Sequence, residues 1–296
     1  MQTVLITGAN GFIGSYLAQN LLGKNYKVVA TGRGGNRLTL EHPHFLYEPL
    51  DFTNEESVKA VFKKHQPHIV VHSGALSKPD ECELNKEAAF LTNVTGTLYL
   101  LQAAEKIKSY FLYLSTDFVF EGNRLDYKEE DAPQPVNYYG RTKVLAEEEV
   151  KKYSHGWSII RTILVYGHPQ SGRQNLLTMV AQALEAGKEL KIVADQTRMP
   201  TYVEDLTGAM TTIIEKKKEG IFHLSGQDVM TPYEIACAVA DYLGLDKSFI
   251  HRVTAESFKE PARRPPTTGF DLAKAQRQLN YLPTTFTEGL KKTFAD

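Results

Sequence analysis

The sequence predicts an α/β protein built around a doubly wound parallel sheet (a Rossmann-type domain). Over the first 167 residues, short apolar segments rich in β-branched residues alternate with helical segments. This alternation is typical of a parallel sheet that is covered by helices on both faces. The first apolar segment leads directly into the glycine-rich sequence TGANGFIG. Right-handed crossovers bring the carboxyl ends of parallel strands to one edge of the sheet, and we expect a ligand there.

The expected strands and helices follow one another in a regular order. Strands are expected at residues 4–8, 27–32, 44–51, 68–74, 110–115 and 157–167. Helices are expected at residues 12–22, from 54 onward, at 85–106, 138–149 and 175–186. The strands are continuously apolar, which indicates burial on both faces. The helices between them supply the crossover connections.

Beyond residue 167 the alternation becomes less regular. We therefore expect a ligand-binding Rossmann-type domain over residues 1–167 and a mainly substrate-binding lobe over residues 168–296, with a loop at 167–175 between them. The segments near 203–224 combine a helical pattern with a short apolar strand, and we expect them to return to the first domain.

Composition limits the classes of partner. With 34 basic and 35 acidic residues the net charge is −1, so nothing favours nucleic acid or an anionic membrane surface. An apolar strand begins at residue 3 and no apolar run approaches ~20 residues, so we expect a cytoplasmic protein without a signal peptide or membrane span. Two cysteines and nine scattered histidines match no metal-ligand spacing, and no metal is expected.

The glycine-rich segment is the most informative motif. Gly8, Gly11 and Gly14 form a GxxGxxG pattern after a strand and at the start of a helix, where the backbone can approach a pyrophosphate. We expect Phe12 and Ile13, which lie between these glycines, to contact the cofactor as well. The alternative is a tight strand-to-helix turn that binds nothing.

The end of the second strand bears on the choice of cofactor. An acidic residue that binds the NAD ribose is expected there, but the strand ends at Gly32 and is followed by Arg33 and Arg37. Guanidinium groups suit a 2′-phosphate, so NADP is favoured and NAD is left open. The alternative is that both arginines are solvated loop residues.

Two adjacent tyrosines precede a lysine in VNYYGRTK. On a helix over 138–149, Tyr139 and Lys143 share one face, whereas Tyr138 points elsewhere. A neighbouring ammonium lowers the pKa of a tyrosine from about 10, which suits proton transfer near neutrality. Thr116 follows a strand that ends at the same sheet edge, where its hydroxyl could meet this pair.

Three segments together resemble the extended short-chain dehydrogenases: GANGFIG, STDFVFEG and PVNYYGRTK. The last two are most similar to dTDP-4-dehydrorhamnose reductases, and the resemblance runs nearly end to end. It implies that Tyr139 donates a proton, Lys143 assists it and Thr116 orients the substrate carbonyl. It also implies that further residues line the cofactor, namely Gly74, Ala75, Leu76, Asp51 and Phe52.

The implied reaction is NADPH-dependent reduction of the 4-keto group of a nucleotide-linked 6-deoxysugar. Dehydratases of this superfamily typically show Thr-Asp-Glu where this chain has Thr116, Asp117 and Phe118, so the elimination of water is not expected. A sugar-nucleotide epimerase is a second alternative. Asp117 either contacts substrate or only forms a turn after the strand.

The substrate itself is weakly specified. The reductases usually carry Trp where this chain has Leu164 in RTILVYG. Four polar residues are candidates to hold a substrate diphosphate: Gln196, Arg198, Arg263 and Arg264. The alternative is that they are surface residues without a ligand.

A third reading places the protein in another functional class. QPHIVVHSGA, ILVYG and MTPYEIACAVADYLGL resemble the regulatory subunit of methionine adenosyltransferase. That resemblance implies an NADP-binding partner protein without turnover. The sequence also leaves a homodimer open.

Overall fold

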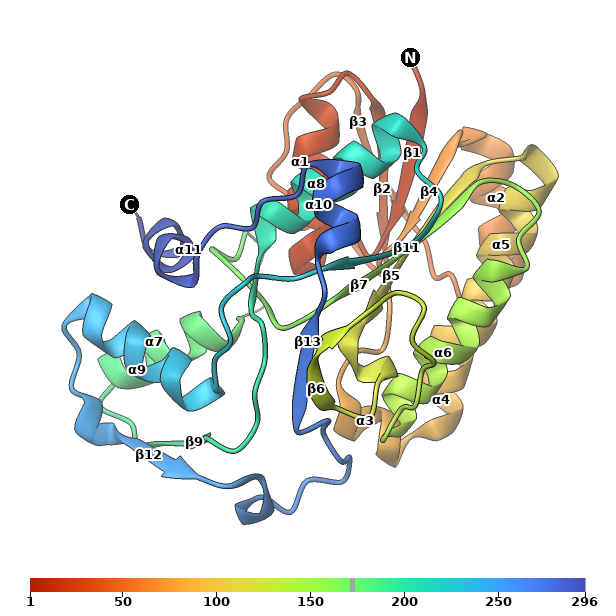
Figure 1. The fold of residues 1–296 in the computed structure, drawn as a ribbon. Helices are drawn as coiled ribbons and strands as arrows, with labels where there is room; N and C mark the ends of the chain where they lie inside the picture. Colours follow the sequence, from red (N-terminus) through yellow and green to blue (C-terminus); the bar gives the residue numbers. More distant parts are fainter. Residues whose placement is uncertain (171–173, 296) are drawn as a thin grey trace.

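The computed structural model describes residues 1–170 and 174–295. Within these residues, seven parallel strands form one sheet in the order β11-β7-β5-β4-β1-β2-β3 (Figure 1). Their bounds are β1 (Thr3–Thr7), β2 (Lys27–Gly32), β3 (Phe45–Pro49), β4 (Ile69–His72), β5 (Tyr110–Thr116), β7 (Trp157–Thr162) and β11 (Gly220–Leu224). The predicted fold class, a doubly wound α/β sheet, is confirmed.

Helices cover both faces of this sheet. One face packs against α1 (Phe12–Leu22), α8 (Val203–Lys216) and α10 (Ala273–Leu279). The other packs against α2 (Glu55–His65), α5 (Gly96–Ile107) and α6 (Tyr138–Lys151). Successive residues of β1 alternate between the two cores, with Val4 and Ile6 in one and Leu5 in the other. This period of two explains why the buried strands are continuously apolar.

The expected strand at 157–167 is wrong in its second half. β7 ends at Thr162, and a short strand β8 (Val165–Tyr166) pairs instead with β10 (Thr201–Tyr202) outside the main sheet. Leu164 lies between the two strands with φ of 35°, in the left-handed region that side chains disfavour. The chain therefore turns out of the sheet at this residue.

The helix expected at 85–106 is confirmed as a continuous helical stretch from Lys86 to Ile107 that contains a π turn. It consists of α4 (Lys86–Phe90), the π-helical turn η1 (Leu91–Thr95) and α5, and α3 (Pro79–Leu84) precedes it. Asn85 begins α4, because its side chain accepts a hydrogen bond from the Ala88 N–H at 3.2 Å. The π turn widens the helix where the buried Asn93 faces inward.

A second group of elements has its own apolar core, which the ribbon shows to one side of the sheet (Figure 1). It comprises α7 (Leu176–Glu185), β9 (Leu190–Val193), α9 (Pro232–Leu243), β12 (Ile250–Val253) and α11 (Phe286–Thr293). The helix expected at 175–186 is thus confirmed, while residues 171–173 of the expected loop at 167–175 lie outside the described residues. β11 pairs with β7 in the main sheet, as expected for the segments near 203–224. The domain boundary at 167 stays a prediction.

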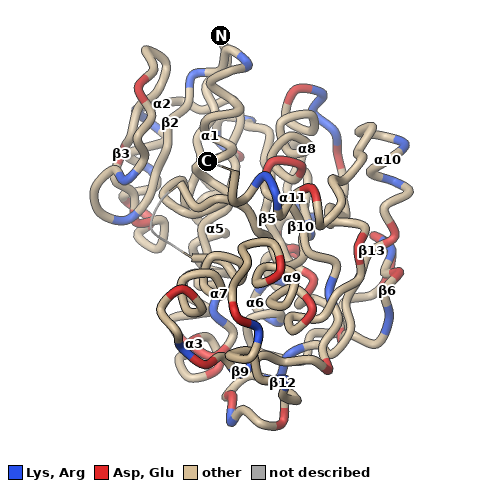
Figure 2. The backbone as a smooth tube through the Cα atoms, turned by 90° about the vertical axis from the view of Figure 1, so that its left-hand side faces the viewer, with Lys and Arg blue, Asp and Glu red and all other residues tan. Residues whose placement is uncertain are grey.

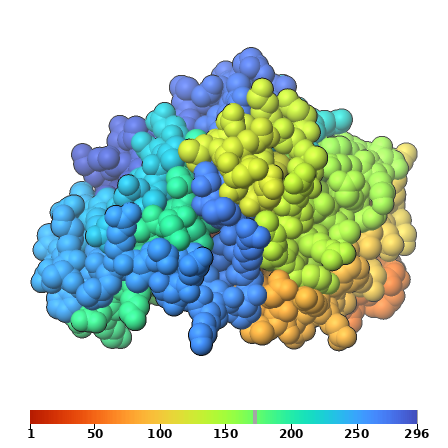
Figure 3. Space-filling view, turned by 60° about the horizontal axis from the view of Figure 1, so that its bottom comes forward, coloured from red at the N-terminus to blue at the C-terminus, as the bar shows by residue number. Residues whose placement is uncertain are grey.

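Another pair of strands, β6 (Asn123–Tyr127) and β13 (Thr267–Phe270), lies between this second group and the sheet (Figure 1). In Figure 3, blue segments from the C-terminal part of the chain lie directly beside the yellow-green segment that contains α6. Segments from the middle and from the C-terminal part of the sequence therefore lie side by side.

Charged side chains of both signs are interspersed along the whole backbone (Figure 2). Among the described residues, no helix is long and apolar enough to cross a membrane. In the same part of the chain, no group of three or more His, Cys, Asp or Glu side chains is placed to hold a metal ion.

Candidate active site

The glycine-rich turn places two backbone segments in direct contact. Gly8 has φ of 68°, and a Cβ at this position would lie 2.7 Å from the Gly74 Cα. A Cβ on Gly14 would lie 2.6 Å from the Gly8 carbonyl oxygen. A side chain on Gly8 would push the turn away from the segment that follows β4, and a side chain on Gly14 would push α1 away from the turn. The turn and Gly74 thus form one surface at the carboxyl edge of the sheet.

The N-terminus of α1 opens onto this surface. Gly11 is its N-cap, and within the described residues no side chain makes a capping hydrogen bond there. Phe12 and Ile13 occupy the first positions of the helix, and the Phe12 ring packs edge-on against Tyr16 at 5.7 Å. Uncapped first-turn amides and the helix dipole favour a bound anion. This end of α1 therefore fits a pyrophosphate.

The loop after β2 carries Arg33 and Arg37, and both side chains are exposed. Asn10 organises this loop: its Nδ2 donates to the Gly35 carbonyl at 3.0 Å, and its Oδ1 accepts from the Arg37 N–H at 3.0 Å. Sequence reasoning did not single out Asn10. The available signal was its position as an amide among the small residues of the glycine-rich motif. The structure shows that this side chain is buried.

Phe52 and Asp51 lie on different surfaces. A Cβ on Gly74 would lie 2.6 Å from Phe52 Cε1, and the Phe52 ring meets His72 edge-on at 5.1 Å. The Phe52 ring therefore packs directly against the Gly74 backbone. Asp51 is exposed, and its carboxylate accepts hydrogen bonds from the Thr53 N–H and hydroxyl at 3.0 and 2.7 Å.

Asn93 fixes the segment that contains Ala75 and Leu76. Its Oδ1 accepts from the Leu76 N–H at 2.8 Å, and its Nδ2 donates to the Leu76 carbonyl at 3.0 Å and to Thr142 Oγ1 at 2.9 Å. It thereby ties the expected cofactor-lining segment to α6. Sequence reasoning missed Asn93. Its signal was an amide inside a predicted helix.

The helix α6 presents Tyr139 and Lys143 as expected. Both side chains are buried, with exposed fractions of 9% and 2%. The Tyr139 ring packs edge-on against Phe118 at 5.8 Å, so it lies beside the segment that follows β5. The Tyr138 ring has a different neighbour: its centre lies 5.4 Å from the Lys86 Nζ of α4. The geometric distinction between the two tyrosines is confirmed.

Lys143 is a buried ammonium with a nearby carboxylate. Its Nζ donates to the Leu114 carbonyl of β5 at 2.7 Å and lies 4.0 Å above the centre of the Tyr113 ring. Burial lowers the pKa of Lys143 to about 7, while the Glu147 carboxylate and the Cys82 thiol act in the opposite direction. Lys143 therefore changes protonation near neutral pH.

Glu147 is one further turn along the same face of α6 and is fully buried. Its carboxylate accepts from Arg161 Nε at 3.0 Å and Nη2 at 2.6 Å, and from the Ser115 hydroxyl at 2.6 Å. Sequence reasoning missed this residue, although the i+4 spacing from Lys143 was its signal. A neutralised carboxylate thus lies behind the candidate catalytic lysine.

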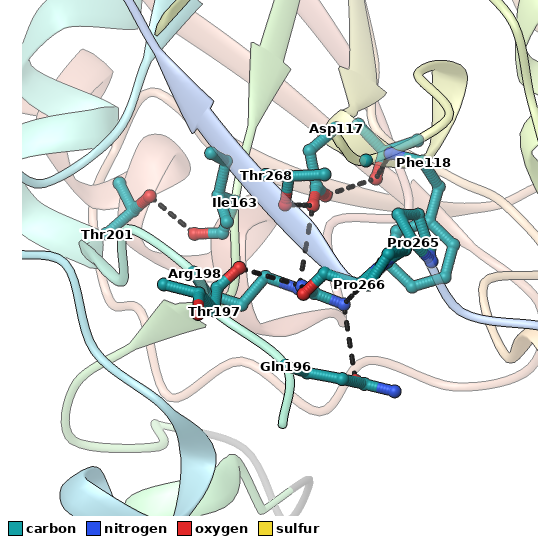
Figure 4. Close-up of polar contacts among 12 residues, drawn as sticks. Asp117, Phe118, Ile163, Gln196, Thr197, Arg198, Thr201, Pro265, Pro266 and Thr268 are labelled. Carbon is teal, nitrogen blue, oxygen red and sulfur yellow. Dashed lines mark hydrogen bonds and ion pairs between the residues drawn. The ribbon is translucent and has the colours of Figure 1, made fainter. Parts of the chain in front are cut away.

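Thr116 ends β5 and is linked to Asp117. The Thr116 hydroxyl donates to Asp117 Oδ1 at 3.1 Å and accepts from the Phe118 N–H at 3.2 Å. Asp117 is 3% exposed, and its Oδ2 accepts from the Thr268 hydroxyl at 2.5 Å (Figure 4). Burial raises the pKa of Asp117, and the Arg198 guanidinium, 3.9 Å away, opposes this rise.

Arg198 is held by the protein itself. Nη1 donates to the carbonyls of Thr197 at 2.8 Å and Pro266 at 3.2 Å, and Nη2 donates to the Pro265 carbonyl at 2.6 Å and to Gln196 Oε1 at 3.3 Å (Figure 4). The guanidinium is therefore already surrounded by acceptors. The structure brings Gln196 and Arg198 together beside Asp117.

The other predicted substrate residues lie elsewhere. Arg263 has an exposed side chain, and its carbonyl accepts from Asn137 Nδ2 at 2.7 Å. Arg264 forms an ion pair with Asp80 of α3 at 2.5 Å. Leu164 is half-buried at the break between β7 and β8, and its carbonyl accepts from the Thr201 N–H at 3.2 Å. Their roles toward a substrate stay predictions.

The sheet order, the glycine-rich turn and the Tyr139/Lys143 pair define a Rossmann-type protein of the extended short-chain dehydrogenase class. More particularly, the chain belongs to the RmlD substrate binding domain family, whose model matches residues 1–296.

The chain is also similar to several known proteins. The chain is 32% identical to methionine adenosyltransferase 2 subunit beta from Danio rerio, over 92% of this chain and 84% of that protein. It is 32% identical to the spore coat polysaccharide biosynthesis protein SpsK from Bacillus subtilis strain 168, over 90% and 87%. The structure of dTDP-4-dehydrorhamnose reductase from Bacillus anthracis strain Ames, in complex with NADP, matches with a TM-score of 0.84 and 28% identity, over 99% of this chain and 98% of that one.

Proposed function

We propose that the protein is an NADPH-dependent reductase of the 4-keto group of a nucleotide-linked 6-deoxysugar. One observation carries this proposal: Thr116, Tyr139 and Lys143 lie together at the carboxyl end of β5. Lys143 is bonded to β5 itself, and Tyr139 packs on the segment that follows Thr116. When a hydride is delivered to a ketone carbon, a hydroxyl, a phenol and an ammonium can stabilise the negative charge that develops on the oxygen and supply its proton.

The residues present fit NADP. The uncapped end of α1 suits the pyrophosphate, and the glycines of the turn leave no side chain between it and Gly74. The exposed Arg33 would meet the 2′-phosphate, and a dTDP-4-dehydrorhamnose reductase with this fold is in complex with NADP. When bound, NADPH supplies the hydride.

The protein's own residues would manage the proton and the negative charge. Tyr139 would give its phenolic proton to the ketone oxygen, and the Lys143 ammonium would stabilise the phenolate that remains. The Thr116 hydroxyl, which donates to Asp117 Oδ1 in the structure, would turn its proton to the same ketone oxygen as negative charge develops there. All three side chains are at most 9% exposed, so these interactions act with little competition from water.

The test is a turnover assay on purified protein. NADPH is incubated with a panel of nucleotide-linked 4-keto-6-deoxysugars, and oxidation of the nicotinamide is followed by absorbance. We expect turnover of at least one ketosugar, and Thr116→Val should lower it ~10²-fold while NADPH affinity holds. A flat trace across the whole panel would remove the reductase proposal.

A second candidate function is regulation of a methionine adenosyltransferase. The observation that favours it is the 32% identity to a beta subunit of that enzyme over 92% of this chain. Under this proposal the protein would bind NADPH, turn over no ketosugar and form a stable complex with a methionine adenosyltransferase catalytic subunit. Size-exclusion chromatography of the two purified proteins, with and without NADPH, measures that complex. Separate elution of the two proteins under both conditions would count against regulation.

A further inference from the structure

Asp117 lies where the second group of elements reaches the candidate catalytic residues. It follows β5 directly, yet its carboxylate contacts Thr268 of β13 and faces Arg198 of the segment before β10 (Figure 4). Of its two oxygens, Oδ2 is approached by Thr268 and Arg198, while Oδ1 accepts from Thr116. The carboxylate thus joins the far segments to the Thr116 hydroxyl.

The far side of this link is rigidly held. Arg198 makes hydrogen bonds to carbonyl groups on both of its terminal nitrogens, which leaves Nε directed at Asp117. The Thr268 N–H donates to the Thr197 carbonyl at 3.0 Å, so β13 and the Arg198 segment are also bonded to each other. A planar guanidinium with fixed acceptors has little freedom to turn. The position of Asp117 is therefore set by the C-terminal segments.

We propose that Asp117 is a positioning residue that acts through Thr116: Arg198 and Thr268 fix its carboxylate, and the carboxylate fixes the rotamer of Thr116 and so the position of its Oγ1. This inference rests on the proposed reductase function. It assigns Arg198 a structural partner in place of a substrate diphosphate. Asp117 is 3% exposed, and an unpaired charge at such a position would be strongly unfavourable. Its contacts with Thr268 and Arg198 offset this cost.

The test is a double-mutant cycle on turnover, with Asp117→Asn, Thr116→Val and the variant that combines them. In the wild-type background Asp117→Asn should lower kcat about 10- to 100-fold, because a displaced Thr116 Oγ1 loses alignment with the ketone oxygen. In the Thr116→Val background the same change should alter kcat less than about twofold. KM and the Kd for NADPH should hold. Losses that multiply in the combined variant would overturn the proposal.

Two further variants separate positioning from simple charge balance. Glu121→Gln removes an exposed carboxylate from the same segment and should leave kcat unchanged. Asp117→Asn combined with Arg198→Met removes both buried charges. If Asp117 only neutralises Arg198, this pair should recover wild-type kcat, and that recovery would contradict the proposal. We expect kcat to stay low.

Folding failure and failure of the reductase function are covered separately. If Asp117→Asn does not fold, Thr268→Val loosens the same carboxylate, and it should lower kcat at constant NADPH affinity; an unchanged kcat would overturn the proposal. If the wild type turns over no ketosugar, the reductase function fails. The positioning role of Asp117 is then tested by crystal structures of the wild type and of Asp117→Asn, both with NADP. The Thr116 rotamer should differ between the two structures, and an unchanged rotamer would refute the positioning role.

Discussion

Lys143 and Arg198 are both buried cations beside the candidate active site, yet their surroundings differ. Lys143 is bonded to the Leu114 carbonyl, and burial lowers its pKa to about 7. Arg198 is bonded through both terminal nitrogens to acceptors of the protein and faces the Asp117 carboxylate. One cation is held so that it can change its protonation; the other is held so that it cannot move.

The difference follows from the chemistry of the two groups. An ammonium is a compact charge whose pKa shifts readily on burial, whereas a guanidinium stays charged and offers a planar set of donors. Sequence alone left Arg198 as either a substrate ligand or a surface charge, and it predicted Lys143 as the partner of Tyr139. The surroundings in the structure suit a chemical role for Lys143 and a scaffolding role for Arg198.

The largest expected effect tests the chemical side of this comparison. Tyr139→Phe removes one hydroxyl and keeps the ring that packs on Phe118. Because that hydroxyl would supply the proton, kcat should fall about 10²- to 10⁴-fold, with folding and NADPH affinity nearly intact. Steady-state kinetics on the best ketosugar measure the loss.

Tyr138→Phe is the matched control for that measurement. Its backbone N–H bonds Glu83 and its ring meets Lys86 at 5.4 Å, away from β5. Turnover should stay within about twofold of wild type. If Tyr138→Phe proves to be the inactive variant, the two sides of α6 have been assigned the wrong way round.

The scaffolding side is tested by Arg198→Met. This change leaves the Asp117 carboxylate buried without its cation, so the free energy of unfolding should fall by about 3–5 kcal/mol. Denaturant titration followed by circular dichroism measures it. Arg263→Met is the control, since that side chain is exposed and should matter by about 0.5 kcal/mol or less. Equal small effects would mean that Arg198 is not a scaffold.

Lys143→Met sharpens the comparison through pH. The pKa of Lys143 is lowered from 10.5 to about 7 by burial, so between these values the unfolded chain binds the proton that the folded chain has released. The free energy of unfolding of the wild type should therefore rise with pH across this window relative to Lys143→Met. Unfolding titrations of both proteins from pH 7 to 10 give the difference. Parallel pH profiles would show that Lys143 is not perturbed.

Much of the fold was predictable because its signals are local. Buried parallel strands are continuously apolar, and Asn54 and Asn175 cap α2 and α7 as their positions suggest. The break at Leu164 was missed because the apolar run continues through it. What turns the chain there is pairing of β8 with β10, which depends on residues remote in sequence.

In the candidate site, too, the features that depend on local sequence were predictable and those that depend on remote segments were not. The spacing of Tyr139 and Lys143 predicts their shared face, because helical geometry alone decides it. The contact between Asp117 and Arg198 depends on how the later segments pack against β5, and no local pattern carries that information. Asn93 was missed for a similar reason, since its role depends on Leu76 and Thr142 meeting at one point.

The smallest expected effect concerns a third basic side chain, Arg33, which is exposed and so contrasts with both buried cations. A charge-assisted contact with the 2′-phosphate should contribute ~1.5–3 kcal/mol, so NADPH should bind about 10- to 100-fold more tightly than NADH. Arg33→Ala should remove most of that preference by weakening NADPH binding alone. Lys27→Ala, at the opposite end of β2, is the exposed control and should preserve the preference. Fluorescence titration of both cofactors gives the affinities. Fluorescence titration at several salt concentrations sharpens the contrast with the buried cations. Because the contact of Arg33 would be solvated, the preference for NADPH should shrink as salt is raised, whereas the changes in unfolding free energy caused by Lys143→Met and Arg198→Met should depend little on salt.

Equal affinities for NADPH and NADH in the wild type would show that Arg33 is only a solvated loop residue.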